Sequence, residues 1–504
     1  MKLNKIKSLI VLSCMTFFVS CNDEFLEVEP KGTDLEDNYY SNQAEAFAGL
    51  TAIYDVLGWN NYSAKLTAVN AASDDHLSGG GSSTDISEIQ VWSNYTLNQT
   101  TGPQWEFWKK GYSGIFRANV LIQKLPAVPM SQSLINTYTA ESKALRAYFY
   151  FDLVRFFKNI PLITAPVSTS QYYNIPQALP QDVFTQIEND LLQAIPDLPP
   201  TVVIETDGGR FTQAAARALL GKVYLWQDKF ALAAEQLAYV NGTPGGTSQY
   251  GNKLLANYSD LWLVDNKFNS ESILEISHTN SGNFGDWGNL PGSEGNIVRQ
   301  MVGPRNYNRI SPSAPDYNSG WGFNPITEDL FNAFNGDPRK SATIINLKQM
   351  KLDGIADYEP GYLDTGYFIE KFAGRVSDRH TGGGAAELNW RQNTYEIRLA
   401  DTYLMEAEAL VRGGGDATRA KDLLDAVRAR VGLTSIPATF DNIFKERRLE
   451  LAGEGHRWFD LIRTGKAATA LASRGFIAGK HEVLPIPFSE LDNTLLIQNP
   501  NYIN

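Results

Sequence analysis

The amino-acid sequence predicts a mostly α-helical protein, built as a tetratricopeptide-like helical-repeat scaffold that carries long, loop-rich insertions with minor β structure. Two observations predict this class. Apolar residues recur at steps of three and four, the spacing of one helix face, in segments 43–57, 105–125, 140–157, 181–195 and 212–240. Two other stretches, 58–104 and 241–395, are rich in Gly, Asn, Ser, Trp and Tyr and are expected to be loop-dominated.

These patterns divide the chain into a leader, a tether and one long domain. We expect a lipoprotein signal peptide over residues 1–20, a lipidated N-terminal tether over 21–40 and a single domain over 41–504. Within that domain the helical scaffold is expected at about 41–57, 105–240 and 395–465. The insertions, which would carry a ligand site, are expected at about 58–104 and 241–394.

The N-terminus has the features of a secreted lipoprotein. Three lysines precede an apolar run over 9–19, which is too short to span a bilayer and ends at Ser20-Cys21. A small residue before cysteine resembles a bacterial lipobox, so we expect Cys21 to be acylated after cleavage. Cys14 is the alternative, but it would leave an apolar run of only about five residues, below the usual 7 to 15.

The composition excludes several classes of function. The sequence has two cysteines, one in the leader and one assigned to lipid, so the mature chain has no thiol for a disulfide, a metal or a nucleophile. Loss of the three leader lysines takes the formal net charge from −12 to −15, which argues against nucleic acid as a partner. An acidic run after the lipid site, Asn22-Asp23-Glu24, resembles a surface-export signal of Bacteroidetes lipoproteins.

The helical segments contain two hairpins that resemble tetratricopeptide units. In 210–237, small residues such as Ala214 and Gly221 alternate with large ones, and Asp228 lies near the turn. The second hairpin is predicted over 396–432, with an inner stripe that starts at Ile397 and with Asp416 capping the second helix after the glycines at 413–415. Another helical stripe is expected to face the core; it consists of Trp105, Trp108, Tyr112, Ile115, Asn119 and Ile122.

Segment 445–466 reads KERRLELAGEGHRWFDLIRTGK and is the most informative stretch of the chain. Glu446, Arg447, Glu450, Glu454 and Arg457 lie three or four positions apart, so their side chains can meet on one helix face. Two interpretations compete: an active site with paired carboxylates beside an arginine, and a structural salt-bridge network. We favour the network, because structural ion pairs imitate active sites and arginine binds carboxylates bidentately.

This segment is similar to the C-terminal signature of the SusD/RagB family, in which Glu-Arg and a later Glu-Gly lead into Arg-Trp-Phe-Asp-Leu-x-Arg. A second family motif, Arg-x-Ala-Asp-x-Tyr-Leu-x-x-Ala-Glu-Ala, is matched from Arg398 to Ala409, and the closing phrase by 499–502. With the lipobox, the resemblance extends over essentially the whole chain. It implies a SusD-like fold and a lipid-anchored protein of the outer membrane that faces the cell exterior.

The resemblance also implies where a ligand binds. Sugars offer weakly polar ring faces and many hydroxyls, so a glycan site needs aromatic platforms and planar Asp, Asn or Arg groups. In the SusD/RagB family the site is assembled from an early Asp followed by an aromatic and from aromatics of the central loops. By zone and residue type, this implies ligand-binding roles for Asp74, Asp75, Trp92, Asn94, Trp287, Arg305, Tyr307 and Trp321.

The assignments of the aromatic residues and of the two aspartates have alternatives. The aromatic residues could instead anchor their loops in the core, and the two aspartates could cap a helix or a turn. Trp321 is better supported than most, because it lies between two glycines and ahead of Pro325, where the backbone is expected to be irregular.

Catalytic and metal-binding motifs are missing from the sequence. The five histidines are isolated, with none four residues from another beside a glutamate, and no Gly-x-Ser-x-Gly elbow appears. We therefore expect no cofactor, no metal and no enzyme activity. A glycoside hydrolase that uses insertion carboxylates such as Asp286 or Asp316 is one alternative, and a peptide-binding uptake protein of the same family is another.

The predicted function follows from the scaffold and the resemblance together, because helical repeats bind more often than they catalyse. We expect a surface lipoprotein that captures oligosaccharide or polysaccharide and passes it to a SusC-like TonB-dependent transporter. The helical scaffold would dock on the transporter and the insertion loops would hold the ligand.

Overall fold

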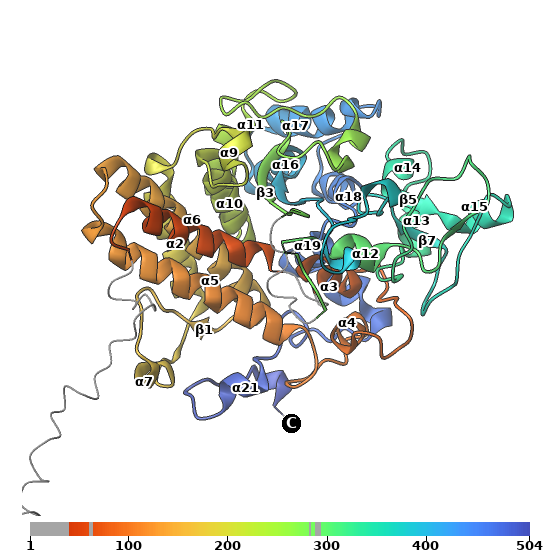
Figure 1. Cartoon of the computed structure of the whole chain (residues 1–504). Coiled ribbons are helices and arrows are strands. Elements are labelled where there is room, and N and C mark those ends of the chain that lie inside the picture. The colour runs from red at the N-terminus through yellow and green to blue at the C-terminus, as the bar shows by residue number, and fades with distance from the viewer. Residues whose placement is uncertain (1–39, 60–63, 282–283, 288–293, 504) are drawn as a thin grey trace, which may run out of the picture.

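The computed structural model describes residues 40–59, 64–281, 284–287 and 294–503, and Figure 1 shows the arrangement of the helices and strands. Within these residues the protein is mostly helical, with four two-stranded sheets. The predicted signal peptide, Cys21 and the tether up to residue 39 lie outside the described residues. Across the described ranges, no helix is long and apolar enough to cross a membrane.

Six long helices form the first half of the scaffold, and they match the predicted segments. Helix α6 is the longest of them; it starts at Gln132 instead of residue 140, because the Ser131 side chain caps it by accepting from Leu134 N at 3.4 Å. The six helices are α2 (Gln43–Gly58), α5 (Gln104–Lys124), α6 (Gln132–Phe157), α8 (Pro180–Ala194), α10 (Gln213–Trp226) and α11 (Phe230–Asn241).

Both predicted helix hairpins are confirmed. Helices α10 and α11 turn at Asp228, whose φ is 56°. They approach closely because Gly221 has no side chain; a Cβ there would lie only 2.6 Å from Leu237. The second hairpin is α16 (Leu399–Gly413) and α17 (Ala417–Arg430), where Asp416 caps α17 by accepting from two backbone N–H groups. One detail is corrected: Ile397 lies in a strand before α16 and not on its inner stripe.

The first insertion is more helical than its composition predicts. It contains α3 (Lys65–Ala72) and α4 (Ser87–Ser93). The last six residues of α3 are all buried, so tertiary packing stabilises a helix that is too short to form alone.

The second insertion leaves and re-enters the scaffold through one pair of strands, β3 (Ser272–Ile276) and β8 (Thr394–Arg398), which are antiparallel. A small core of its own, which includes Tyr317, Tyr358 and Phe368, orders its loops. Its other elements are β4 (Asn308–Arg309) paired with β6 (Ala356–Asp357), β5 (Ile344–Asn346) paired with β7 (Tyr367–Ile369), and the short helices α12 (Val298–Val302), α13 (Glu328–Ala333), α14 (Lys340–Thr343) and α15 (Leu347–Leu352).

The C-terminal segment packs back onto the scaffold. It contains α18 (Phe440–Glu450), α19 (Arg457–Arg463), α20 (Ala467–Ala470) and α21 (Phe488–Leu491). The connections elsewhere hold α7 (Thr169–Tyr172), α9 (Ile204–Asp207) and the sheet of β1 (Ile160–Pro161) with β2 (Gln177–Ala178).

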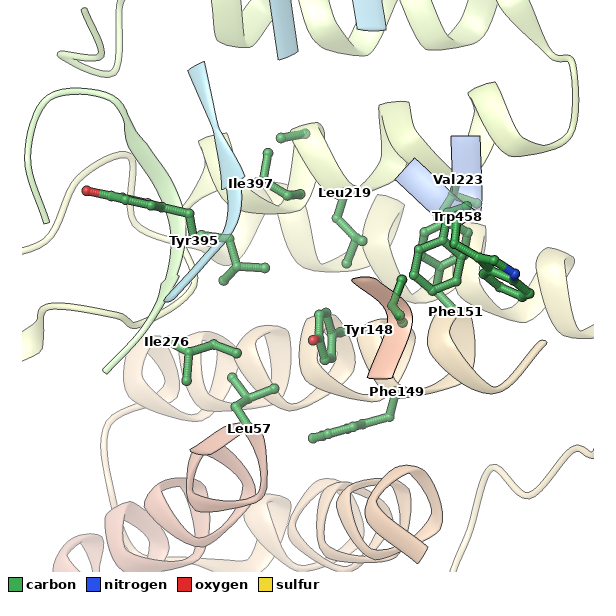
Figure 2. Packing of buried hydrophobic residues seen from close by; sticks show 14 of the residues in the cluster. Leu57, Tyr148, Phe149, Phe151, Leu219, Val223, Ile276, Tyr395, Ile397 and Trp458 are labelled. Carbon is green, nitrogen blue, oxygen red and sulfur yellow. The ribbon is translucent and has the colours of Figure 1, made fainter. Parts of the chain in front are cut away.

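One large core joins the scaffold, the strand pair and the C-terminal segment. Figure 2 shows Leu57 of α2, Tyr148 of α6 and Ile276 of β3 converging there, with Trp458 of α19 at one side. Of the predicted α5 stripe, Trp108, Ile115 and Asn119 are buried, whereas Trp105 is 42 % exposed, which corrects that part of the prediction.

Buried ion pairs fasten segment 445–466 to the rest of the protein, which confirms the structural network. Glu450 accepts from Arg398 at 2.6 Å and from Arg339 at 2.8 Å, and Arg447 binds Asp401 at 2.7 Å. The expectation that these charges meet one another on one helix face is corrected, since most of their partners come from β8, α16, α17 and the second insertion.

A buried histidine of the first insertion predicts acid sensitivity. His76 is 1 % exposed and its Nδ1 lies 3.2 Å from Asn324 O. Burial lowers the pKa of His76 from 6.5 to about 3. Below pH 6.5 the unfolded chain therefore takes up a proton that the folded chain does not, so stability falls as the pH falls.

Comparing the wild type with His76→Gln isolates this contribution. The difference in their free energies of unfolding should shrink by about 1.4 kcal/mol per pH unit between roughly pH 6 and 4. Urea unfolding at several pH values measures it. A difference that does not change with pH would show that His76 is protonated in the folded protein.

Candidate functional site

Trp321 is held by two backbone segments of the second insertion that run side by side. Trp321 N donates to Gln300 O, and Gly322 N donates to Gly303 O, both at 2.8 Å. A Cβ on Gly320 would lie 2.5 Å from Gly303 Cα, so only glycine allows the backbones to approach this closely. Trp321 therefore projects from a fixed backbone and not from a flexible loop.

Trp287 comes from segment 284–287, which the loop before β8 holds in place. Gly285 N donates to Asn389 Oδ1 at 2.9 Å, and Asn389 Nδ2 donates back to Gly285 O at 2.9 Å. The ring of Phe284 packs against His380, with centroids 4.9 Å apart. These contacts fix a segment that has no regular secondary structure.

The indole rings of Trp287 and Trp321 lie side by side. Their centroids are 5.9 Å apart and their planes are inclined by 35°. Trp287 is 47 % exposed and Trp321 is half-buried. We call this pair the tryptophan platform; its rings offer two neighbouring apolar faces that can each cover the C–H face of a sugar.

Arg305 lies beside the tryptophan platform. Its Nη1 donates to Trp321 O at 3.1 Å, which is the one hydrogen bond of its guanidinium within the described residues. Since a guanidinium carries five N–H donors, others can reach ligand hydroxyls. Within the described residues, a surface for stacking and a group with free N–H donors therefore lie side by side.

Tyr362 is linked through Gly80 to Gly322, the residue after Trp321, and it was not predicted from the sequence as a site residue. Its backbone N donates to Gly80 O at 2.8 Å, Gly80 N donates to Gly322 O at 2.9 Å, and the ring is 36 % exposed. Tyr362 follows Gly361, and a glycine beside an aromatic residue was the reason for predicting Trp321. The same pattern in the sequence could therefore have identified Tyr362.

Two predicted residues make other contacts. The Tyr307 hydroxyl donates to Pro315 O at 2.7 Å, and its ring packs edge-on against Tyr317 at 5.3 Å. Asn94 is exposed at the end of α4, where its Oδ1 accepts from Thr96 N at 3.2 Å. A ligand role for either remains a prediction.

The two aspartates are bound by the C-terminal signature segment. Asp74 accepts from Arg457 Nε at 2.8 Å and Nη2 at 2.7 Å, and Asp75 accepts from Arg448 Nε at 2.7 Å. Burial raises the pKa of Asp74, but Arg457 outweighs this and holds it below its usual range. Their carboxylates join two segments, so a ligand would have to compete with charge-assisted bonds.

The prediction that Trp92 forms a sugar platform is wrong. Its side chain is fully buried and packs edge-on against Phe107, Phe156 and Trp458, the last with centroids 5.2 Å apart. Trp92 lies on the inner face of α4, so it holds that helix in the core, as its alternative interpretation stated.

Both carboxylates of the hydrolase alternative accept hydrogen bonds within the protein, and that of Asp316 is poorly suited to acid catalysis. Asp286 Oδ1 accepts from Trp287 N at 2.8 Å. Slight burial acts to raise the pKa of Asp316, but hydrogen bonds from Ser377 keep it below its usual range, whereas a general acid needs a raised pKa. Within the described part of the chain, no group of three or more His, Cys, Asp or Glu residues could hold a metal ion.

Comparison with known proteins identifies the family. A model described as "SusD family" matches residues 354–502, and one described as "Starch-binding associating with outer membrane" matches residues 24–225. A solved laminarin binding SusD-like protein is 56 % identical, covers 92 % of this chain and 100 % of its own, and superimposes with a TM-score of 0.89. The chain belongs to the SusD family.

Other SusD-like relatives agree with this assignment. Surface glycan-binding protein A from Bacteroides thetaiotaomicron, solved in complex with laminarihexaose, is 28 % identical over 91 % of this chain and 99 % of its own, with a TM-score of 0.81. SusD-like protein P38 of Formosa agariphila is 26 % identical over 98 % of both chains. The predicted family, helical SusD-like fold and non-catalytic glycan-binding class are confirmed.

Proposed function

We propose that this SusD-like protein captures laminarin-type glucan at the cell surface. The observation that carries the proposal is the tryptophan platform, two fixed and solvent-accessible rings beside an arginine. The relative with the 56 % identical sequence is named for laminarin binding, and another SusD-like relative was solved with laminarihexaose. The incline of 35° between the rings suits a glucan that turns from one sugar to the next.

Capture and delivery are separate steps in this proposal. Cys21 anchors the protein in the outer membrane, and the acidic residues that follow it direct the chain to the outer face. The bound glycan then passes to a SusC-like TonB-dependent transporter. An open platform supports transfer, since a ligand stacked on two rings can leave without a large rearrangement, unlike one enclosed in a deep pocket.

Calorimetric titration tests the glycan specificity. We expect laminarihexaose to bind at least about tenfold more tightly than maltohexaose, a difference of about 1.4 kcal/mol. The mature protein should leave both hexasaccharides intact over the same period. Preference for maltohexaose would contradict the proposed substrate, preference for peptides would favour the peptide-uptake alternative, and release of shorter sugars would contradict a binding role.

A further inference from the structure

A cleft separate from the tryptophan platform opens on the surface formed by α4, the start of α5 and α21. Its volume is about 550 Å³, within the range of ligand sites in proteins. Its walls include two aromatic side chains and four polar ones; these are Trp105, Phe488, Glu88, Gln99, Gln104 and Glu106. We call it the α4–α5 cleft.

The two aromatic rings are unusually exposed. Trp105 is 42 % and Phe488 is 58 % exposed, although both residues belong to segments that pack on the core. Large apolar groups that gather around a cleft on a protein surface commonly mark a binding site. Both are placed so that a ligand in the cleft would cover them.

The walls of the α4–α5 cleft are fixed in position. Phe488 N donates to Gln99 O at 3.0 Å, and Gln99 Nε2 donates to Tyr502 O at 2.9 Å. Trp108, one turn after Trp105 on α5, donates from Nε1 to Glu490 Oε2 at 3.0 Å. These hydrogen bonds hold the C-terminal segment against α5. The cleft walls are therefore ordered before a ligand binds, which lowers the entropy cost of binding.

A buried polar group at the cleft lacks a partner. Gln104 lines the cleft and is 2 % exposed; its Nε2 donates to Asn98 O at 2.7 Å. Its Oε1 has no hydrogen-bond partner among the described residues. An unpaired buried acceptor is costly, and a hydroxyl-rich ligand supplies donors.

The α4–α5 cleft borders the segment that also supports the tryptophan platform. Gln90 of α4 donates from Nε2 to Gly79 O at 2.8 Å, and Gly80 N donates to Gly322 O, next to Trp321, at 2.9 Å. Glu88, on the same helix, lines the cleft. In the view of Figure 1, α4 lies between α12 and α21. Residues 79–90 therefore connect the two surfaces.

We propose that the α4–α5 cleft is a second glycan subsite, which holds sugar units of the same glucan chain beyond those on the tryptophan platform. This inference rests on the proposed function. Aromatic faces with amide and carboxylate groups are the chemistry that recognises sugars, and residues 79–90 support both surfaces. Short oligosaccharides fill the platform alone, and polysaccharide reaches both.

Chain length separates the two surfaces in a binding experiment. The full mature protein and its Trp105→Ala and Phe488→Ala variants are titrated with laminarihexaose and with laminarin polysaccharide. Each variant should bind laminarin about three- to tenfold more weakly, the range expected for loss of one aromatic contact, and should bind laminarihexaose as the wild type does. Phe116→Ala is the matched control, because Phe116 is 53 % exposed on α5 and does not line the cleft.

The outcomes distinguish this inference from the proposed function. Unchanged laminarin affinity in both cleft variants, with normal wild-type binding, overturns the second subsite and leaves the platform in place. Equal losses for both ligands also overturn it, because the cleft would then be part of the short-chain site. Failure of the wild type to bind either glucan overturns the proposed function itself. Thermal unfolding of each variant confirms that it is folded before titration.

Discussion

Replacing Glu450 by alanine should lower the free energy of unfolding by about 3–5 kcal/mol, the loss typical when one partner of a buried ion pair is removed. Glu450 is fully buried and its carboxylate binds three arginines, Arg398, Arg339 and Arg430. Without the carboxylate, these guanidinium groups remain buried with less negative charge to offset them. The variant is expected to unfold at lower denaturant concentration and to accumulate poorly.

The ionised state of Glu450 supports the expected loss of about 3–5 kcal/mol. Burial alone would raise its pKa, but Arg430, Arg398 and Arg339 together hold the pKa well below the usual range. Glu450 is therefore ionised in the folded protein at neutral pH. Its backbone carbonyl also accepts from Lys371 Nζ at 3.0 Å, so the residue joins α18 to the second insertion as well as to β8 and α17.

Chemical denaturation with glycan titration checks this prediction. Glu328→Ala is the matched control, because Glu328 pairs with Lys348 at 3.7 Å on the exposed surface, where an ion pair contributes about 0–1 kcal/mol. Any Glu450→Ala protein that remains folded should bind laminarihexaose normally. A variant of full stability that has lost glycan binding would instead make segment 445–466 part of the ligand site.

The sequence predicted the helical scaffold well because its signal is local. Helical periodicity, the glycine break at 413–415 and the Asp416 cap act over a few neighbouring residues, so no knowledge of tertiary contacts is needed. The charge pattern of segment 445–466 was also sufficient to predict a structural network. Its partners were not predictable, because Arg398 and Arg339 are brought to Glu450 only by packing of segments distant in the sequence.

In the candidate site, too, local features were predictable from the sequence and long-range contacts were not. Trp321 was predictable, since flanking glycines imply irregular backbone near the surface. Trp92 was not, because its burial depends on α4, a seven-residue helix that tertiary contacts stabilise. Asp74 has the residue type of a sugar site, yet Arg457, far away in the sequence, donates two hydrogen bonds to its carboxylate. Residue type identifies candidates, and packing decides which of them are accessible.

Removing both rings of the tryptophan platform should weaken laminarihexaose binding by about 100-fold, or about 2.7 kcal/mol, since a few aromatic residues usually carry most of a binding energy. Trp287→Ala and Trp321→Ala should each lose about 30-fold, or about 2 kcal/mol, because loss of either ring also weakens binding on the other. Tyr239→Ala is the control, an exposed aromatic on α11 that is 47 % accessible and far along the chain from the platform. Wild-type affinity in both single variants would place the glycan site elsewhere.

The double variant also shows whether the two rings bind as one platform. Residues in contact usually couple by about 0.5–3 kcal/mol, whereas independent sites add. With centroids 5.9 Å apart, the rings can cover adjacent sugars of one chain. Loss of either ring then leaves the chain less well positioned on the other, so the losses of the single variants should not sum to that of the double. Strict additivity would mean that each tryptophan contacts the glycan independently, and the 35° incline would then have no role in selecting a curved chain.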